Sequence, residues 1–480
     1  MSSQNDHESG ETTTTITATT HLTLPAHPTP LTYDQLNPRS SPSEFFGPIG
    51  TFLVSTVAPF WAYFIFFACN EHTGCHPTSA DAWRETFEGF TGKWVSSAGQ
   101  LWDWKAVGVY LAWYAFCVVC WIVLPGDKVE GTLMRNGKRK TYTMNGFYTL
   151  VLSLGLALGV ILQPGGVEKF TWLYDHWIPL TSAALAMSVI QATWVWAWSY
   201  YSGELLALGG NSGNFIYDWF MGRPLNPTLP GFPNFDIKTF NEVRPGIIGW
   251  DMLNIACACE QYIRLGRVTD SMILVLLFEG WYTFDSLWFE SAILNQMDIT
   301  TDGFGFMLSF GDLVWVPFTY GLQARYLAFH PIDLGLAATV GIVIVKLLGV
   351  WAFRGANGEK FDFRNGRNPK NLKYMETERG TKLLISGWWG VSRHPNYLGD
   401  WLMALSWSLP TGFNTPLTYY YLGFFIVLLV HRQIRDDEAC RKKYGKDWDK
   451  VSRMARAEAD GQYCELVPWR IIPYIVGESC

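Results

Sequence analysis

Charged side chains are scarce in this sequence. Asp, Glu, Lys and Arg together make up 16% of its 480 residues, whereas 49% are hydrophobic and 16% are aromatic. Because soluble domains carry about 25% charged residues, this composition indicates a chain that lies largely in lipid. The mean hydropathy of +0.07 is modest because a polar N-terminus and several charged loops are averaged with long apolar runs.

The sequence also lacks an excess of basic residues. Its 36 Lys and Arg are outnumbered by 42 Asp and Glu, which gives a formal net charge of -6. Nucleic-acid-binding domains carry a basic patch or stripe, so we expect no nucleic-acid partner. Residues 1–42 are polar and lack the pattern of a cleaved signal peptide. We expect them to form a disordered cytosolic tail before a single folded domain over residues 43–480.

Motifs for metal and nucleotide binding are missing as well. The nine cysteines show no zinc-type spacing with histidine, so we expect no metal site. Cys117 and Cys120 form a CxxC inside an apolar run, where buried thiols are the favoured interpretation. Cys69 and Cys75 fall near a segment expected in the lumen, and both a disulfide and two free thiols remain open there. No GxGxxG follows a strand pattern, so a Rossmann domain is not indicated.

About ten segments are long and apolar enough to span a bilayer as helices. Short loops and belts of Trp and Tyr separate them, which favours a membrane bundle over a large soluble core. We therefore predict an all-α, polytopic membrane helix bundle of about ten transmembrane helices. The expected spans are residues 49–69, 106–124, 146–162, 178–201, 247–265, 271–294, 304–328, 334–353, 397–409 and 417–431.

Basic clusters near the ends of these spans predict the orientation. Lys and Arg gather over residues 135–140, 354–382 and 432–450, after the second, eighth and tenth spans. Since cytosolic loops are enriched in Lys and Arg, all three clusters are expected in the cytosol, together with both termini.

Ionisable residues inside apolar runs are functional candidates, because charge at membrane depth is costly. In the sixth span, Glu279, Tyr282, Ser286 and Glu290 recur at helical spacing. In the seventh, Asp312 shares a predicted face with Thr319 and Gln323. Two facing polar stripes would line a cavity, and the alternative is interhelical hydrogen bonding that only holds the helices together.

The most specific motif is GWWGVSRHPNYLGD, residues 387–400. It resembles the signature of the sterol reductase family, which includes the sterol C-14, delta-7 and carbon-24(28) reductases. Further segments are similar to the C-14 reductase branch, including the C-terminal domain of the lamin B receptor. They are GNSGNFIYDWFMGRPLNP (210–227), FNEVRPGIIGW (240–250) and the stretch 287–327 that contains DGFGF.

The resemblance implies a cytosol-facing NADPH pocket in residues 354–480. Lys360 and Arg364 stand four residues apart and can converge on one anion if the segment is helical. A solvated charged face is the alternative. The family's cofactor-binding positions fall on Lys360, Arg364, Leu384, Trp389, Asn396, Tyr397, Asp436, Cys440, Arg441, Lys442, Lys443, Tyr444 and Tyr463. Residues 451–462 depart from the family pattern as an insertion before Tyr463, and a retained intron is one hypothesis for them.

The function that the resemblance implies is reduction of the C14=C15 double bond of an 8,14-diene sterol in ergosterol biosynthesis. An isolated alkene is a poor hydride acceptor, so a proton donor is needed; we expect Tyr282 with Glu290, and Asp312 next. The alternatives are carbon-24(28) or delta-7 reduction, a membrane methyltransferase with a similar RHPxY-type motif, and a non-catalytic sterol-binding or scaffold protein.

The location and partners follow from the same resemblance. We expect a multi-pass protein of the endoplasmic reticulum membrane. Its partners would be a sterol substrate, the lipid bilayer and other sterol-biosynthesis enzymes.

Overall fold

The computed structural model describes residues 31–42, 44–75, 79–92, 101–449 and 471. The chain divides into two compact units. Among the described residues, the large unit consists of Leu31–Val350 and Gly399–Arg432, and the small unit contains Trp351–Leu398 and residues 433–449. The helices α17 (Gly335–Arg364), α19 (Pro395–Ser408) and α20 (Tyr420–Tyr444) each contribute to both units.

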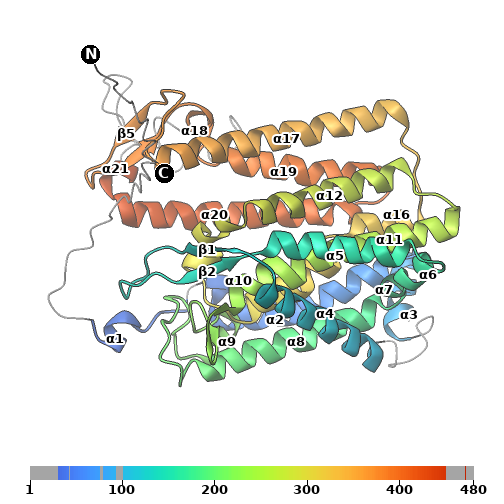
Figure 1. Cartoon of the computed structure of the whole chain (residues 1–480), viewed down its shortest axis with the longest axis horizontal. Helices are drawn as coiled ribbons and strands as arrows, with labels where there is room; N and C mark the ends of the chain where they lie inside the picture. Colours follow the sequence, from blue (N-terminus) through green and yellow to red (C-terminus); the bar gives the residue numbers. More distant parts are fainter. Residues whose placement is uncertain (1–30, 43, 76–78, 93–100, 450–470, 472–480) are drawn as a thin grey trace, which may run out of the picture. The chain divides into compact units, whose positions relative to one another are not determined.

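The large unit is built from helices that run side by side in Figure 1. Besides its parts of α17, α19 and α20, its helices are α1 (Tyr33–Leu36), η1 (Glu44–Phe46), α2 (Gly47–Ala68), α3 (Ala80–Phe90), α4 (Trp104–Val123), α5 (Gly146–Ile161), α6 (Gly166–Phe170), α7 (Trp172–Asp175), α8 (Trp177–Trp198), α9 (Phe215–Met221), α10 (Ile237–Asn241), η3 (Glu242–Gly246), α11 (Ile247–Leu265), α12 (Asp270–Trp288), η4 (Glu290–Asn295), α13 (Met297–Thr300), α14 (Phe306–Phe310), η5 (Gly311–Trp315), α15 (Val316–Thr319), α16 (Leu322–Phe329), η6 (Leu409–Thr411) and η7 (Leu417–Tyr419).

The strands of the described residues form three antiparallel two-stranded hairpins. In the large unit β1 (Asp127–Glu130) pairs with β2 (Thr141–Met144), and β3 (Thr228–Leu229) pairs with β4 (Phe232–Asp236). In the small unit β5 (Tyr374–Glu376) pairs with β6 (Lys382–Leu384), beside the short helices α18 (Trp388–Val391) and α21 (Lys446–Asp449). The predicted all-α class is confirmed, because the strands are short and peripheral to the helices.

Within the described residues, five helices are long and apolar enough to cross a membrane. They are Glu44–Ala68, Trp104–Val123, Trp177–Trp198, Gly335–Arg364 and Leu417–Tyr444. The prediction of about ten such spans is not confirmed. The helix α5 has 16 residues and α19 has 14, while the seventh predicted span is divided among α14, η5, α15 and α16. Pro317 contributes to that division, since proline lacks the backbone N–H that a continuous helix needs.

The end of the expected N-terminal tail is folded where the structure describes it. Residues 1–30 lie outside the described residues, but α1 follows them with a Thr32–Gln35 capping box. Asn37 accepts a hydrogen bond from the Leu206 amide at 2.8 Å, and its own carbonyl accepts one from Asn211 at 3.0 Å. These contacts attach the segment after α1 to the loop before α9.

The structure shows which of these cysteines form a disulfide and which are free thiols. Cys69 and Cys75 form a disulfide at the end of α2. Cys117 and Cys120 are free and buried within α4 and its neighbours. The CxxC therefore consists of two packed thiols rather than a bridged pair.

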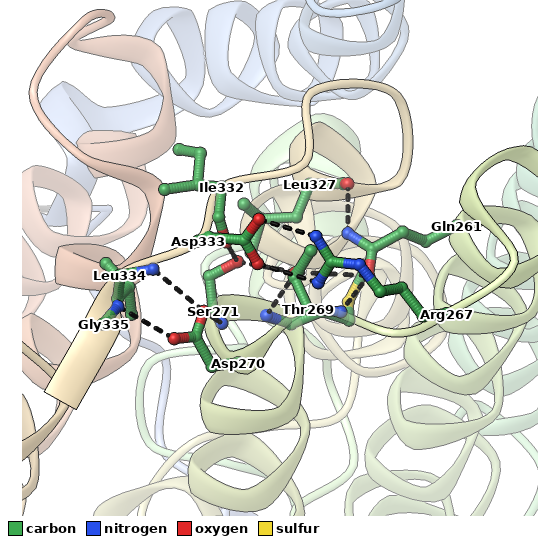
Figure 2. Close-up of polar contacts among 11 residues, drawn as sticks. Gln261, Arg267, Thr269, Asp270, Ser271, Leu327, Ile332, Asp333, Leu334 and Gly335 are labelled. Carbon is green, nitrogen blue, oxygen red and sulfur yellow. Dashed lines mark hydrogen bonds and ion pairs between the residues drawn. The ribbon is translucent and has the colours of Figure 1, made fainter.

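A polar corner joins the α11–α12 turn to the α16–α17 turn (Figure 2). Gln261 donates to the Leu327 carbonyl at 2.7 Å and accepts from the Thr269 amide at 2.8 Å. Asp270 accepts from the amides of Leu334 and Gly335 at 2.9 and 3.0 Å, which satisfies donors at the start of α17. The corner holds α17 against α12 from one end.

Two π-helical turns meet at their backbones. The turn η3 precedes α11 and the turn η5 lies between α14 and α15. Gly246 ends η3, and a Cβ atom at this position would lie 2.0 Å from the carbonyl oxygen of Asp312. Only glycine allows this approach, and π turns occur frequently at functional sites.

We predict that Gly246→Ala destabilises the protein because the added methyl group must displace the Asp312 backbone. The expected cost is about 1–3 kcal/mol, measured as a lower midpoint of thermal unfolding in detergent. Gly280→Ala is the control, since no atom lies within 4 Å of its added Cβ. Equal midpoints for Gly246→Ala and the wild type would contradict the close approach.

Candidate active site

Tyr282 lies in a cluster of aromatic rings contributed by four helices and the residue after α15. Its ring centroid is 5.7 Å from that of Trp407 on α19 and 6.3 Å from that of Trp250 on α11. Tyr320 follows α15 and packs 5.6 Å from Trp250 and 4.4 Å from Tyr421 of α20. Several π faces therefore surround one phenol, and such faces attract a positive charge.

Buried polar groups border this aromatic cluster. Glu279 is 0% exposed and accepts a hydrogen bond from Asn254 at 2.6 Å, and Asp251 accepts one from Thr283 at 3.2 Å. Both contacts join α11 to α12. The Asn254 amide thus bonds one oxygen of the Glu279 carboxylate, while the other oxygen, Oε1, is buried and has no hydrogen-bond partner among the described residues.

Asp400 and Lys346 bring ionisable groups to the same region. Lys346 of α17 is 4% exposed, donates to the Phe278 carbonyl at 3.1 Å, and lies 5.2 Å from the ring centroid of Trp407. Asp400 of α19 lies within electrostatic reach of both Tyr282 and Lys346. One carboxylate oxygen of Asp400, Oδ1, is buried and has no hydrogen-bond partner among the described residues. This oxygen is free to accept a hydrogen bond or to hold a proton.

Glu290 lies apart from the face predicted for it. The helix α12 ends at Trp288, so the helical spacing that placed Glu290 below Tyr282 does not continue to residue 290. Its carboxylate accepts from the Gly146 amide at 2.8 Å and pairs with Arg244 at 3.1 Å. Arg244 also donates to Asn145 at 2.6 Å. The described partners of Glu290 therefore belong to α5 and η3 and do not include Tyr282.

Asp312 lies in the π turn η5, where it faces a different set of charges. Its electrostatic neighbours are Glu242 of η3, Asp298 of α13 and Lys238 of α10. Burial and the nearby Asp298 raise the pKa of Glu242 above its usual range, and burial lowers the pKa of Lys238 to about 8. Asp298 also pairs with Arg432 of α20. Thr319 and Gln323, predicted on the face of Asp312, bond instead to a backbone carbonyl and to the η6–η7 region.

The expected cofactor residues that are described all lie in the small unit. Lys360 of α17 stands 4.2 Å from the ring centroid of Trp389, whose indole donates to the Ala356 carbonyl at 2.8 Å. Lys360 is also within electrostatic reach of Arg364, Asp436 and Cys440. Two cations four residues apart beside an aromatic face suit a phosphorylated ligand that also carries a ring.

The RHPNY segment supplies buried polar atoms to this unit. Arg393 pairs with Asp437 of α20 at 3.1 Å, and both side chains are buried. The side-chain oxygen of Asn396 is buried and has no hydrogen-bond partner in the described part of the chain. His394 stacks on Tyr397 with ring centroids 4.6 Å apart. The unpaired Asn396 oxygen fits a ligand with donor groups, such as an amide or a ribose.

The remaining predicted positions are distributed around the same unit. Leu384 is 7% exposed at the end of β6, and Asp436, Cys440, Arg441, Lys442, Lys443 and Tyr444 follow one another along the last turns of α20. Tyr444 packs against Trp448, which together with Met375 and Leu383 forms a small apolar core. Tyr463 and the insertion 451–462 lie outside the described residues.

Comparison with known proteins identifies the family of the chain. The family model described as the ergosterol biosynthesis ERG4/ERG24 family matches residues 39–476. The chain belongs to this family. It is therefore a multi-pass membrane protein of the ERG4/ERG24 family, and the resemblance found in its motifs is confirmed.

Relatives within the family are similar over most of the chain. A delta(14)-sterol reductase of Schizosaccharomyces pombe is 47% identical over 90% of this chain and 97% of its own length. That of Saccharomyces cerevisiae is 44% identical over 76% of this chain and 83% of its own. The delta(14)-sterol reductase LBR of Gallus gallus is 40% identical over 89% of this chain and 63% of its own.

Two ionisable residues near Tyr282 were not among the site residues predicted from the sequence. Lys346 and Asp400 both lie in apolar stretches that were predicted as spans, where any charge is a functional candidate. The same criterion that selected Tyr282 and Asp312 would have selected them.

We predict that Glu290→Ala destabilises the protein, because it leaves Arg244 buried without its partner. Removing one member of a buried pair typically costs about 3–5 kcal/mol, which should lower the thermal midpoint strongly. Tyr282→Phe, which keeps the ring packed, should leave that midpoint close to the wild-type value. A Glu290→Ala variant with unchanged stability would contradict the structural role of this ion pair.

We predict that His394 makes the stability of the protein depend on pH. Burial, with the positive charges of Lys360 and Arg393, lowers the pKa of His394 to about 3. Since the unfolded histidine titrates near 6.5, the unfolded state binds the extra proton first, and stability falls as the pH drops from about 6.5 toward 3. Between pH 7 and pH 5 this loss should be about 2 kcal/mol. Equilibrium unfolding of the wild type and His394→Gln measures it. An equal pH dependence in the two proteins would contradict the shift.

Proposed function

We propose that this protein is a delta(14)-sterol reductase that reduces the C14=C15 double bond of an 8,14-diene sterol with NADPH. The observation that carries the proposal is the similarity over about nine-tenths of the chain to delta(14)-sterol reductases, at 47% identity to that of Schizosaccharomyces pombe. Ergosterol biosynthesis is the corresponding pathway, as the family description states.

The chemistry requires a proton and a hydride. Protonation at carbon 15 breaks the C14=C15 π bond and leaves a cation at carbon 14, which is conjugated with the C8 double bond. When bound, NADPH supplies the hydride that forms the new C–H bond at carbon 14, and NADP⁺ remains. A cation formed near Tyr282 would meet the π faces of Trp250, Trp407 and Tyr421, which favour positive charge.

Tyr282 is the proton donor in this proposal. Its phenol lies within electrostatic reach of Asp400, whose buried Oδ1 can return a proton to it after each turnover. Asp312 is the second candidate for the proton donor. It lies within electrostatic reach of the phenol of Tyr320, and Tyr320 belongs to the same aromatic cluster as Tyr282. Glu290 is assigned to positioning: it fixes η4 and the start of α5 through Arg244.

The small unit would bind the cofactor. Lys360 and Arg364 would face the phosphate groups, Trp389 and Tyr444 would offer aromatic faces, and Asn396 would hydrogen-bond an amide or ribose. Leu384, Tyr397, Asp436, the segment 440–444 and Tyr463 complete the proposed set.

The proposed location is the endoplasmic reticulum membrane, with both termini and the small unit in the cytosol. The basic clusters at residues 135–140 and 354–382 support this orientation. Cytosolic NADPH would then bind directly, while the sterol enters from the bilayer, and other sterol-biosynthesis enzymes in the same membrane could supply it.

We predict that Tyr282→Phe lowers turnover of a delta(8,14) sterol by at least about 100-fold, because a positioned proton donor contributes about 10²–10⁴-fold. NADPH oxidation in membranes, with and without the sterol, measures the turnover, and titration of cofactor fluorescence measures NADPH binding. NADPH binding should be unchanged, since Tyr282 is not among the proposed cofactor residues.

Controls separate the parts of this proposal. Tyr262→Phe, an exposed tyrosine of α11, should keep full activity, and Asp312→Asn tests the second donor candidate. Full activity of Tyr282→Phe would exclude Tyr282 as the donor. Reduction of a carbon-24(28) or delta-7 double bond instead of delta-14 by the wild type would replace the proposed substrate, and methyl transfer would replace the reaction.

A further inference from the structure

A cavity of about 380 Å³ lies in the large unit, and none of the proposed cofactor residues lines it. Its walls come from α4, α5, α6, α8, η3, α11 and α15, with Leu173 of α7 at one end. Small-molecule sites commonly have volumes of about 300–1,000 Å³. The cavity is therefore large enough for a small lipid. Its lining is almost entirely apolar and does not suit the charged groups of a dinucleotide.

The cavity and the Tyr282 cluster lie on opposite faces of α11. Gly249, Met252 and Leu253 line the cavity. Asp251 and Asn254, in contrast, bond to α12, and Trp250 packs on Tyr282. At 3.6 residues per turn, these two sets project in opposite directions. A molecule in this cavity is separated from Tyr282 by the body of α11, so the cavity is not the reaction centre.

One polar atom in the lining lacks a partner. Three lining side chains carry hydrogen-bonding groups: Trp113 donates to the Pro245 carbonyl at 3.1 Å, and Ser153 donates to the Thr149 carbonyl at 2.7 Å. The hydroxyl of Tyr110 is buried, and no hydrogen-bond partner for it occurs among the residues that the structure describes. Because a buried hydroxyl without a partner costs free energy, this site favours a ligand with a single hydroxyl group.

The lining of the cavity extends along two helices and reaches the outer surface. The lining residues of α4 extend from Val109 to Phe116 and those of α5 from Ser153 to Val160, which is about 10 Å along each helix. Leu156 and Val160 are 52% and 37% exposed on the outer surface of α5. The cavity thus borders the surface that faces lipid, from which an apolar molecule could enter.

We propose that this cavity binds one sterol molecule at a second, non-catalytic site, with the sterol 3-hydroxyl hydrogen-bonded to Tyr110. A sterol matches the two features of the lining, because it has an apolar body and one hydroxyl group. A phospholipid acyl chain would fill apolar space but would leave the Tyr110 hydroxyl unpaired. The proposal goes beyond the reductase function and does not depend on which double bond is reduced.

The site also lies against both π turns. Pro245 of η3 and Pro317, two residues after η5, line the cavity. These turns carry Glu242 and Asp312 and meet at Gly246. A bound sterol would therefore pack against the segment that holds the second proton-donor candidate and would stabilise its backbone.

A photoreactive sterol tests the site in phosphatidylcholine nanodiscs that contain the full-length protein. The probe is a saturated sterol that carries a 3-hydroxyl and a diazirine, so it cannot be reduced. We expect labelled peptides within residues 104–123 and 146–161, and excess unlabelled sterol should suppress this labelling. Excess phospholipid that suppressed it equally would identify the occupant as an acyl chain and overturn the proposal.

Two variants, each with a control, test whether sterol labelling and binding depend on this cavity. Ala157→Trp fills the cavity and should abolish labelling at α4 and α5, whereas Leu158→Trp, on the exposed side of the same helix, should not. Tyr110→Phe should weaken sterol binding about three- to tenfold, the effect of one hydrogen bond. Tyr148→Phe, an exposed tyrosine of α5, should have no effect. Unchanged binding in both Ala157→Trp and Tyr110→Phe would overturn the proposal.

Activity in the same nanodiscs keeps this proposal separate from the reductase function. Ala157→Trp should retain reduction of a delta(8,14) sterol while it loses the label at α4 and α5. Labelling confined to peptides around Tyr282, with normal activity, would refute the second site and leave the reductase function intact. Labelling at α4 and α5 without any sterol reduction would support the second site and refute the reductase function.

Discussion

The buried ion pair between Arg244 and Glu290 fixes the geometry on which much of the large unit depends. Arg244 is 1% exposed and donates to Glu290, Asn145 and the Thr143 carbonyl. It thereby joins η3 to η4, β2 and the start of α5. Removing two charges from water costs several kcal/mol per ion, and this cost is offset only when geometry and additional hydrogen bonds are good. The three acceptors of Arg244 come from different parts of the chain, so these contacts bring the four elements together at one place.

This constraint determines where the neighbouring elements begin. Glu290 satisfies the Gly146 amide at the start of α5, and Arg244 lies in the π turn that continues into α11. Because Gly246 follows two residues later and contacts the Asp312 backbone, the position of η3 also positions η5. The ion pair, the two π turns and the course of α11 are therefore one connected arrangement, and α11 in turn presents Trp250 to Tyr282.

The sequence predicted the helical class and supplied candidate site residues, but it did not predict the local breaks in the helices. Tyr282 could be selected because an ionisable group in an apolar run is costly. Glu290 was expected on the same face because uniform spacing was assumed, whereas α12 ends at Trp288. Asp312 was grouped with Thr319 and Gln323 for the same reason, although a π turn shifts the register between them. Hydrophobic periodicity does not show where a helix changes its hydrogen-bond pattern, since those changes depend on partners distant in sequence, such as Gly246. The cofactor positions depended on motif resemblance, because no spacing rule brings β6, the RHPNY segment and α20 together.

The two faces of α11 also explain how polar and apolar functions can coexist within a lipid environment. Asp251 and Asn254 each make a side-chain hydrogen bond to α12, so the polar face of α11 is directed toward polar groups inside the protein. The opposite face carries Gly249, Met252 and Leu253, which have no polar atoms to satisfy and can border an open cavity without a desolvation cost. Polar groups on both faces would have required partners on both sides and would have closed this space. The division of α11 into a polar face bonded to α12 and an apolar face is therefore the physical reason why a lipid-sized cavity can exist one helix away from the proposed reaction centre.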